Sequence, residues 1–181
     1  GPTISISANL HGDEYTGMLV IHKLLQDSSL TSQLKGTLIL LPSLNPIGSL
    51  LGKRAYSLTN DDPNRLFPDE NSNSKKNNFT EISMQKIFDE LKHHSSFHVD
   101  FHCSKIYSVP FIYSDPLFQE TKDIILKIRK AISTFGFFQV IDNVGSFFTS
   151  HYNRTFTGSL IHQAGIPAFT VELGSRKVVD L

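Results

Sequence analysis

Residues 97–102, Phe-His-Val-Asp-Phe-His, alternate between apolar and polar side chains. Successive side chains of a β-strand point to opposite faces of the sheet, so this alternation predicts a strand. Its apolar side chains would face the core, and His98, Asp100 and His102 would share the other face. Two imidazoles and a carboxylate on one face of a strand predict a functional site there.

Strands and helices alternate along the rest of the chain. We predict strands at 3–10, 37–44, 137–141 and 168–172, and helices around 18–25, 84–91 and 124–135. Strands that alternate with helices favour an α/β sheet whose functional groups lie at strand ends.

Three local features complete this reading. Residues 37–44 are apolar enough to be a central strand, ended by Pro46 and Gly48. Residues 56–79 are rich in Asn, Asp, Ser and Pro, which predicts a long irregular loop. We expect Thr80 to cap the helix that follows this loop.

Composition limits the classes of partner. The 181 residues carry 17 basic and 17 acidic side chains, so the formal net charge is +0 and no bulk field attracts nucleic acid or an anionic membrane. No apolar run approaches the roughly 20 residues of a membrane helix. The single cysteine, Cys103, excludes an internal disulfide and fits a reducing compartment, so we expect a cytoplasmic protein.

The two ends of the chain raise a question of completeness. The sequence opens without Met, at Gly1-Pro2, and stops nine residues after Glu172. Either an upstream segment is absent or the first two residues are a cloning remnant. We therefore expect residues 1–181 to form one catalytic domain from a fragment that lacks N-terminal and C-terminal segments.

A metal site is the main chemical hypothesis. His11 and Glu14 are three residues apart in a turn that leaves the first strand, and His102 ends the strand at 97–102 with Asp100 available to orient its imidazole. Three protein ligands leave a position for water, which is the arrangement of catalytic zinc. A structural zinc would need a fourth ligand, and strand alternation turns Cys103 away. The residues alone leave both a catalytic metal and coincidence open.

Ordered motifs link the chain to a known family. They are His-Gly-Asp-Glu at 11–14, Asn-Pro-Ile-Gly at 45–48, Arg54, Asp-Asp-Pro-Asn-Arg-Leu-Phe-Pro at 61–68, Asp-Phe-His at 100–102 and Thr-Val-Glu-Leu-Gly at 170–174. In this order the chain resembles the succinylglutamate desuccinylase/aspartoacylase family over nearly its whole length. The resemblance implies an α/β fold with a mixed, largely parallel central sheet flanked by helices, similar to that of the zinc carboxypeptidases.

The resemblance also implies a metal, a base and a reaction. His11, Glu14 and His102 match the ligands of one zinc ion per chain, and Glu172 matches the general base that activates water at the zinc. Zinc lowers the pKa of its water toward about 7, and a carboxylate can take the proton.

Three further residues match substrate-handling positions of the family. Arg54 matches the arginine that polarises the scissile carbonyl, and Asn64 with Arg65 matches the pair that grips the substrate carboxylate. The family's Asp-Leu-Asn-Arg reads Asp-Pro-Asn-Arg here, at 62–65, and Pro63 restricts the loop. We therefore expect the chemistry to hold, whereas the loop's approach to the substrate, and with it the identity of the substrate, stays open.

The expected function is a zinc-dependent deacylase that cleaves the amide bond of a small N-acyl amino acid bearing a carboxylate. The nearest alternative is a carboxypeptidase or peptidoglycan-type peptidase of the same clan. An alternative of another class is an inactive metal-binding module. Among the other polar residues, His98 could replace a ligand, and His151, Tyr152 and Arg154 could line the substrate pocket.

Overall fold

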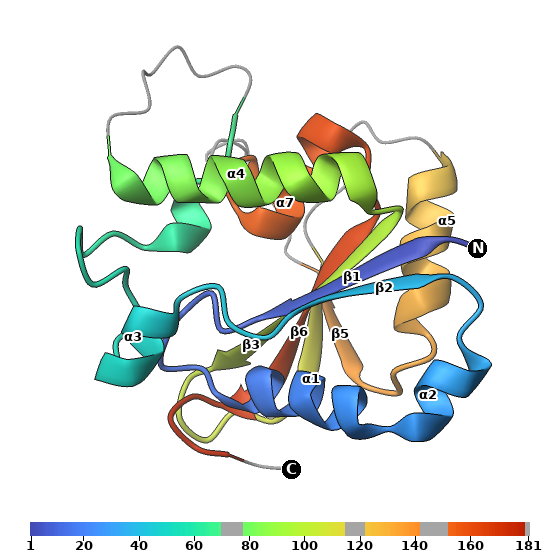
Figure 1. The fold of residues 1–181 in the computed structure, drawn as a ribbon, viewed down its shortest axis with the longest axis horizontal. Helices are drawn as coiled ribbons and strands as arrows, with labels where there is room; N and C mark the ends of the chain where they lie inside the picture. The colour runs from blue at the N-terminus through green and yellow to red at the C-terminus, as the bar shows by residue number, and fades with distance from the viewer. Residues whose placement is uncertain (70–77, 115–121, 142–151, 180–181) are drawn as a thin grey trace.

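The computed structural model describes residues 1–69, 78–114, 122–141 and 152–179 (Figure 1). Its described strands form a six-stranded sheet in the order β2-β1-β3-β6-β4-β5. Their bounds are β1 Thr3–Ala8, β2 Thr37–Leu41, β3 Phe97–Ser104, β4 Phe111–Ser114, β5 Phe138–Ile141 and β6 Ala168–Ser175. Neighbouring strands are parallel except β4 and β6, which are antiparallel. The predicted mixed, largely parallel α/β sheet is confirmed.

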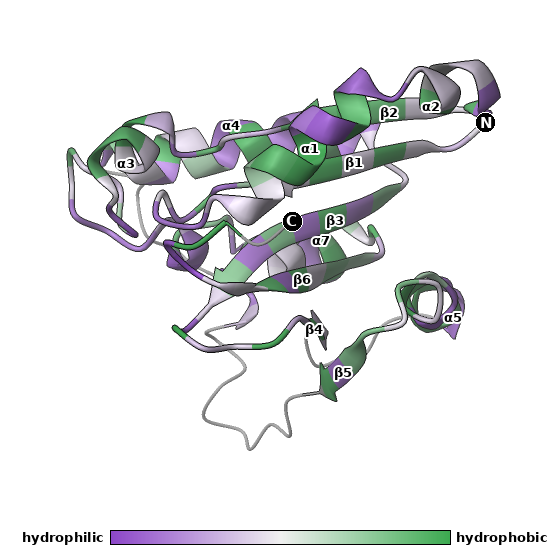
Figure 2. Cartoon of the chain, turned by 90° about the horizontal axis from the view of Figure 1, so that it is seen from below, coloured by the Kyte–Doolittle hydropathy of each residue, from purple (hydrophilic) through white to green (hydrophobic). Residues whose placement is uncertain are grey.

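Helices flank both faces of the sheet. They are α1 Thr16–Gln26, α2 Ser28–Gln33, α3 Pro46–Leu51, α4 Phe79–His94, α5 Lys122–Ile132 and α7 Phe156–Ala164, with a 3₁₀ turn at Pro63–Arg65. Figure 1 shows α4 and α7 on one side of the sheet and α1 with α2 on the other. At the far end, α5 lies beside β5 (Figure 2).

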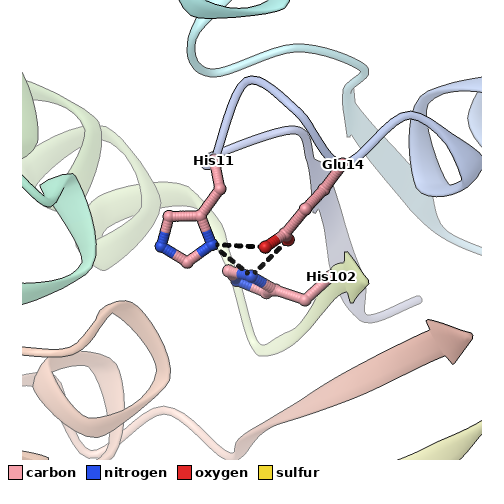
Figure 3. Close-up of side chains that lie close together, drawn as sticks. All are labelled: His11, Glu14 and His102. Carbon is pink, nitrogen blue, oxygen red and sulfur yellow. Dashed lines mark hydrogen bonds and ion pairs between the residues drawn. The ribbon is translucent and has the colours of Figure 1, made fainter. Parts of the chain in front are cut away.

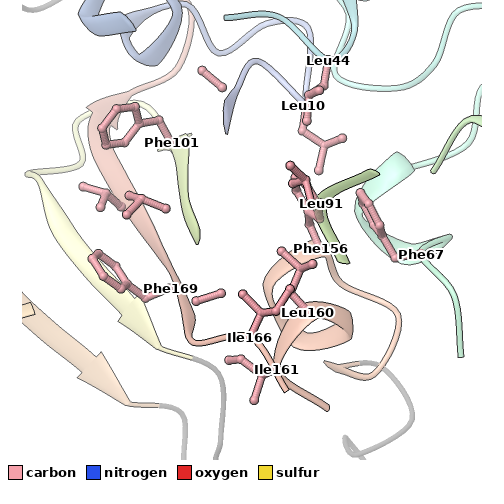
Figure 4. Close-up of a cluster of buried hydrophobic side chains, with 14 of the residues drawn as sticks. Leu10, Leu44, Phe67, Leu91, Phe101, Phe156, Leu160, Ile161, Ile166 and Phe169 are labelled. Carbon is pink, nitrogen blue, oxygen red and sulfur yellow. The ribbon is translucent and has the colours of Figure 1, made fainter. Parts of the chain in front are cut away.

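The core lies between these layers. Phe67 and Phe156 stack with ring centroids 4.3 Å apart, and both are fully buried (Figure 4). On the opposite face α1 approaches β3 closely at Gly17, where a Cβ atom would lie 2.5 Å from the Cβ of Phe101. Only glycine fits at this distance, so the sequence sets how deeply α1 sits on the sheet.

The structure corrects the prediction for residues 37–44. This segment ends as a strand at Leu41 and lies at the edge of the described sheet, whereas we predicted a central strand. The strand residues, Thr37–Leu41, are exposed or only partly buried, so the apolar composition of this segment did not mark a central strand.

Two helix starts were also misjudged. Pro46 begins α3, and the Asn45 side chain accepts a hydrogen bond from the Gly48 N–H, so the residues expected only to end a strand start a helix. Helix α4 is capped by Asn78 and not by Thr80, whose buried hydroxyl lies 2.6 Å from that of Thr59.

The predicted loop at 56–79 is described only in part, since residues 70–77 lie outside the described ranges. Its described portion contains the 3₁₀ turn, which approaches the sheet where β1 and β3 end. Within the described ranges no helix combines the length and the apolar character needed to cross a membrane.

Candidate functional site

Three side chains converge where β1 and β3 end. His11 and Glu14 lie in the turn between β1 and α1, and His102 lies near the end of β3, which is parallel to β1. The Glu14 carboxylate is 2.8 Å from His11 Nδ1 through Oε1 and 2.9 Å from His102 Nδ1 through Oε2 (Figure 3). The two Nδ1 atoms are 3.1 Å apart. All three residues are buried.

The turn that carries His11 and Glu14 is held by Asn9. Asn9 has a left-handed φ of 57°, and its Nδ2 donates to the carbonyl oxygens of His11, Gly12 and Glu14. Gly12 allows the α3 backbone to approach, because a Cβ atom there would lie 2.2 Å from the Gly48 carbonyl carbon. Sequence reasoning missed Asn9, although an asparagine between a strand and a motif turn is a usable signal.

A carboxylate contacts the far nitrogen of each histidine. Asp100 Oδ2 lies 2.7 Å from His102 Nε2, and Asp62 Oδ1 lies 3.1 Å from His11 Nε2. Metal-ligating histidines usually have such a partner, which fixes the tautomer and leaves the other nitrogen for the ion. The sequence predicted the Asp100 contact but not the Asp62 contact, which crosses 51 residues.

The charges in this cluster shift one another's pKa values. Burial alone would raise the pKa of Glu14, but His102 and His11 outweigh it and hold that pKa far below its usual range. Burial alone would lower the pKa of His102, but Asp100 and Glu14 raise it well above its usual range. The Cys103 N–H also donates to Glu14 Oε2 at 3.0 Å, while its thiol contacts Thr16 on the opposite side.

Glu172 faces the same cluster from β6. It pairs in register with His102 across the parallel strands. Its Oε2 is buried and has no hydrogen-bond partner among the described residues. Burial raises the pKa of this carboxyl group. A buried carboxylate oxygen without a partner is costly, and a proton, water or cation nearby would satisfy it.

Arg54 links two of the carboxylates. Its guanidinium lies 3.1 Å from Glu14 Oε1 and 3.2 Å from Asp62 Oδ2. Burial would raise the pKa of Asp62, but His11 and Arg54 lower it well below its usual range. The Arg54 side chain stays 39% exposed, so it can also meet a ligand.

Asn64 and Arg65 lie in the 3₁₀ turn at the rim. Asn64 Oδ1 accepts a hydrogen bond from the Phe156 N–H at 2.8 Å, which fixes its amide plane against the start of α7. Arg65 is exposed. Both residues line one cavity of about 530 Å³ together with His11, Glu14, Arg54, His102 and Glu172. The structure thus brings the sequence-predicted site residues together around one pocket, apart from Asp100, which lies behind His102.

Sequence reasoning missed several lining residues. They are Cys103, Ser104, Lys105, Tyr113, Thr155, Thr157, Thr170 and Arg176. Thr170 could have been found, because it lies two residues before Glu172 and therefore on the same strand face. Tyr113 could not, since β4 was not predicted.

The weaker sequence candidates have mixed outcomes. Tyr152 lines the pocket as expected. Arg154 instead holds the fold together, donating to the Phe67 carbonyl oxygen and to Glu81 at 3.1 Å. His151 lies outside the described residues. His98 does not join the ligand cluster but contacts Ser5 and Ser7 beneath it.

The donor set fits zinc. Two imidazole nitrogens and a carboxylate oxygen within 4.8 Å of one another are ligands that zinc prefers, and each imidazole has its orienting carboxylate. The mixed sheet with this cluster at its strand ends defines a metallocarboxypeptidase-like α/β fold.

Comparisons with known proteins place the chain in a family. The model of the succinylglutamate desuccinylase/aspartoacylase catalytic domain matches residues 1–181. The chain belongs to this family, whose members are hydrolases, and the membership supports an enzyme. A comparison with curated proteins gave no match.

Solved structures share the fold. A succinylglutamate desuccinylase/aspartoacylase from Rhodobacter sphaeroides is 24% identical with a TM-score of 0.81, over 100% of this chain and 51% of that one. The ectoine utilization protein EutE from Ruegeria pomeroyi is 24% identical with a TM-score of 0.74, over 99% and 52%. A metallo-carboxypeptidase from Burkholderia cenocepacia is 16% identical with a TM-score of 0.76, over 97% and 48%. The chain therefore spans about half the length of these structures.

Proposed function

We propose that this chain is the catalytic domain of a zinc-dependent deacylase that cleaves the amide bond of a small N-acyl amino acid bearing a carboxylate. One observation carries the proposal. The pocket that holds the His11, Glu14 and His102 cluster also contains Glu172, whose buried Oε2 has no partner among the described residues. A metal site next to a carboxylate of raised pKa is the arrangement of a metal-assisted hydrolase.

One zinc ion per chain would be held by His11, Glu14 and His102. When bound there, zinc polarises the substrate carbonyl and lowers the pKa of water toward about 7. Asp62 and Asp100 would hold the two imidazoles in the tautomers that ligation needs, since each contacts the nitrogen away from the cluster.

Glu172 is the proposed general base. Its Oε2 accepts the proton of the attacking water and later delivers it to the leaving amine. Burial raises its pKa toward the working range of a base at neutral pH. Because Glu172 is in register with His102 on the neighbouring strand, the base is fixed relative to the ligand cluster.

Arg54 and Arg65 are assigned to two different negative charges of the substrate. Arg54 is anchored by Glu14 and Asp62, so its guanidinium is preorganised to neutralise charge that develops on the carbonyl oxygen. Arg65 stands exposed at the rim of the pocket, with Asn64 beside it, and we assign them the substrate carboxylate. We propose no nucleic-acid or membrane partner, and the cytoplasmic location stays a prediction.

Metal analysis and a substrate panel test the function together. We expect about one zinc per chain in the purified protein and faster hydrolysis of N-acyl amino acids than of dipeptides. Preference for dipeptides would favour the peptidase alternative. Zinc binding without turnover on either class would favour an inactive metal-binding module.

Arg65→Lys should weaken recognition of the substrate carboxylate. A lysine keeps the electrostatic attraction but loses the bidentate geometry of arginine. We expect KM to rise about tenfold, which corresponds to the loss of one charge-assisted hydrogen bond, and kcat to change less. Steady-state kinetics on the best acyl amino acid and its carboxamide analogue measure this effect. Wild type should discriminate strongly against the carboxamide, and the variant should discriminate less.

Arg129→Lys on the exposed face of α5 is the matched control and should behave as wild type. Equal hydrolysis of the acid and the carboxamide by wild type would show that no carboxylate grip exists.

A further inference from the structure

A chain of buried polar groups lies beneath the His-Glu-His cluster. Ser5 Oγ is 2.7 Å from His98 Nδ1, and Ser7 Oγ is 3.0 Å from His98 Nε2. Ser7 Oγ also donates to Asp100 Oδ1 at 2.5 Å, and Asp100 Oδ2 contacts His102 Nε2 at 2.7 Å. The parallel register of β1 and β3 creates this chain, because it sets Ser5 opposite His98 and Ser7 opposite Asp100.

The direction of the hydrogen bonds follows from the number of protons. A serine hydroxyl has one proton, and that of Ser7 goes to the Asp100 carboxylate, which can only accept. Ser7 must therefore accept from His98, which places a proton on Nε2 of His98.

His98 then has one proton and one lone pair to use. Burial lowers the pKa of His98 to about 4, so the ring is neutral at pH 7 and Nδ1 is an acceptor. Ser5 Oγ donates to it at 2.7 Å, and its other acceptor, the Phe97 carbonyl oxygen, is more distant at 3.3 Å. Every donation in this chain thus runs from Ser5 through His98 and Ser7 to Asp100.

The last member of this hydrogen-bonded series, Asp100, determines which nitrogen of His102 carries the proton. With Ser7 on Oδ1, Asp100 presents Oδ2 to His102, whose Nε2–H donates to it. This contact leaves Nδ1 of His102 directed at Glu14 and His11. Because every residue of this hydrogen-bonded series is at most 3% exposed, water does not compete for these hydrogen bonds.

We propose that His98 is a positioning residue, which acts through Ser7 and Asp100 to hold the His102 imidazole in the tautomer and orientation that zinc binding requires. The inference rests on the proposed zinc site. His98 also packs against the Phe156 ring with centroids 4.6 Å apart, so packing and hydrogen bonding must be separated by experiment.

The decisive measurement is zinc affinity, obtained by competition with a chromophoric chelator. Ser7→Ala removes one hydroxyl and should weaken zinc binding about tenfold. This is the lower end of the loss in metal affinity seen when a residue that supports a metal ligand by hydrogen bonding is replaced. His98→Leu should weaken it similarly. If the groups act in series, the double variant should lose no more affinity than Ser7→Ala alone, whereas independent effects would multiply.

Two further variants separate positioning from packing. His98→Gln keeps an N–H donor near the position of Nε2 and should bind zinc more tightly than His98→Leu. Ser159→Ala removes another fully buried serine hydroxyl, one that lies within hydrogen-bond distance of the Pro68 and Asn153 carbonyl oxygens, and should leave zinc affinity unchanged. Near-ultraviolet circular dichroism checks that each variant keeps its tertiary packing.

The tautomer can be read in the metal-free protein. Imidazole ¹⁵N shifts should show His98 protonated at Nε2 and unprotonated at Nδ1, and the opposite pattern would overturn the proposed direction. If wild type binds zinc and folded Ser7→Ala binds it with equal affinity, this inference is wrong and the proposed function is unaffected. No zinc binding by wild type would overturn the proposed function and this inference together.

Discussion

Glu172→Gln should lose about 10²-fold to 10⁴-fold in turnover while it keeps its zinc. The amide has the shape of the carboxylate but cannot accept the proton of the attacking water. Since Glu172 is not one of the three converging ligands, its replacement should leave the metal content unchanged. Steady-state kcat on the best acyl amino acid, with zinc measured in the same preparation, gives both values.

Glu90→Gln is the matched control, because Glu90 lies on α4 with a 79% exposed side chain. It should retain wild-type kcat. Near-wild-type turnover in Glu172→Gln would show that another group is the base. Loss of zinc in that variant would show instead that Glu172 is a ligand.

His102→Ala should reduce the zinc content from about one ion per chain to about none after dialysis. The variant removes one of three ligands and also deprives Asp100 of its 2.7 Å partner. An uncompensated buried carboxylate is costly, so we also expect a lower melting temperature. Elemental analysis and thermal unfolding measure the two effects.

His22→Ala controls for the loss of an imidazole, since His22 is exposed on α1. It should keep its zinc and its melting temperature. Full zinc occupancy in His102→Ala would contradict the ligand assignment, and zinc loss in both variants would indicate unspecific binding.

The polarity pattern along the chain predicted several strands of the sheet, among them β3, whose two faces carry apolar and polar side chains and therefore show the two-residue period of a strand. It could not rank the strands from centre to edge. Residues 37–44 are as apolar as a central strand, yet β2 has β1 as its one neighbour in the described sheet. Apolar composition does not set strand order, which depends on which segments pair.

Helix starts were harder to predict than helix interiors. Pro46 was interpreted as a breaker, but proline also suits the first turn of a helix. Helix α7 was missed altogether, although Thr155 caps it by accepting from the Gly158 N–H. Pro46 suits both the end of a strand and the start of a helix, and the surrounding structure decides between the two.

The sequence by itself determined the strand that carries His98, Asp100 and His102, the turn that carries His11 and Glu14, and the side of the strand on which they lie. These features depend on covalent spacing and on the two-residue period of a strand, which are local. The motifs also placed the chain in its family before any contact was known.

Only the tertiary structure decided which groups meet. The contact of Asp62 with His11 spans 51 residues, that of Arg54 with Glu14 spans 40, and that of Ser7 with His98 spans 91. These contacts depend on strand register and loop closure. A shift of one residue between β1 and β3 would preserve every local pattern and yet separate Ser7 from Asp100, because register is a property of two segments and not of either one.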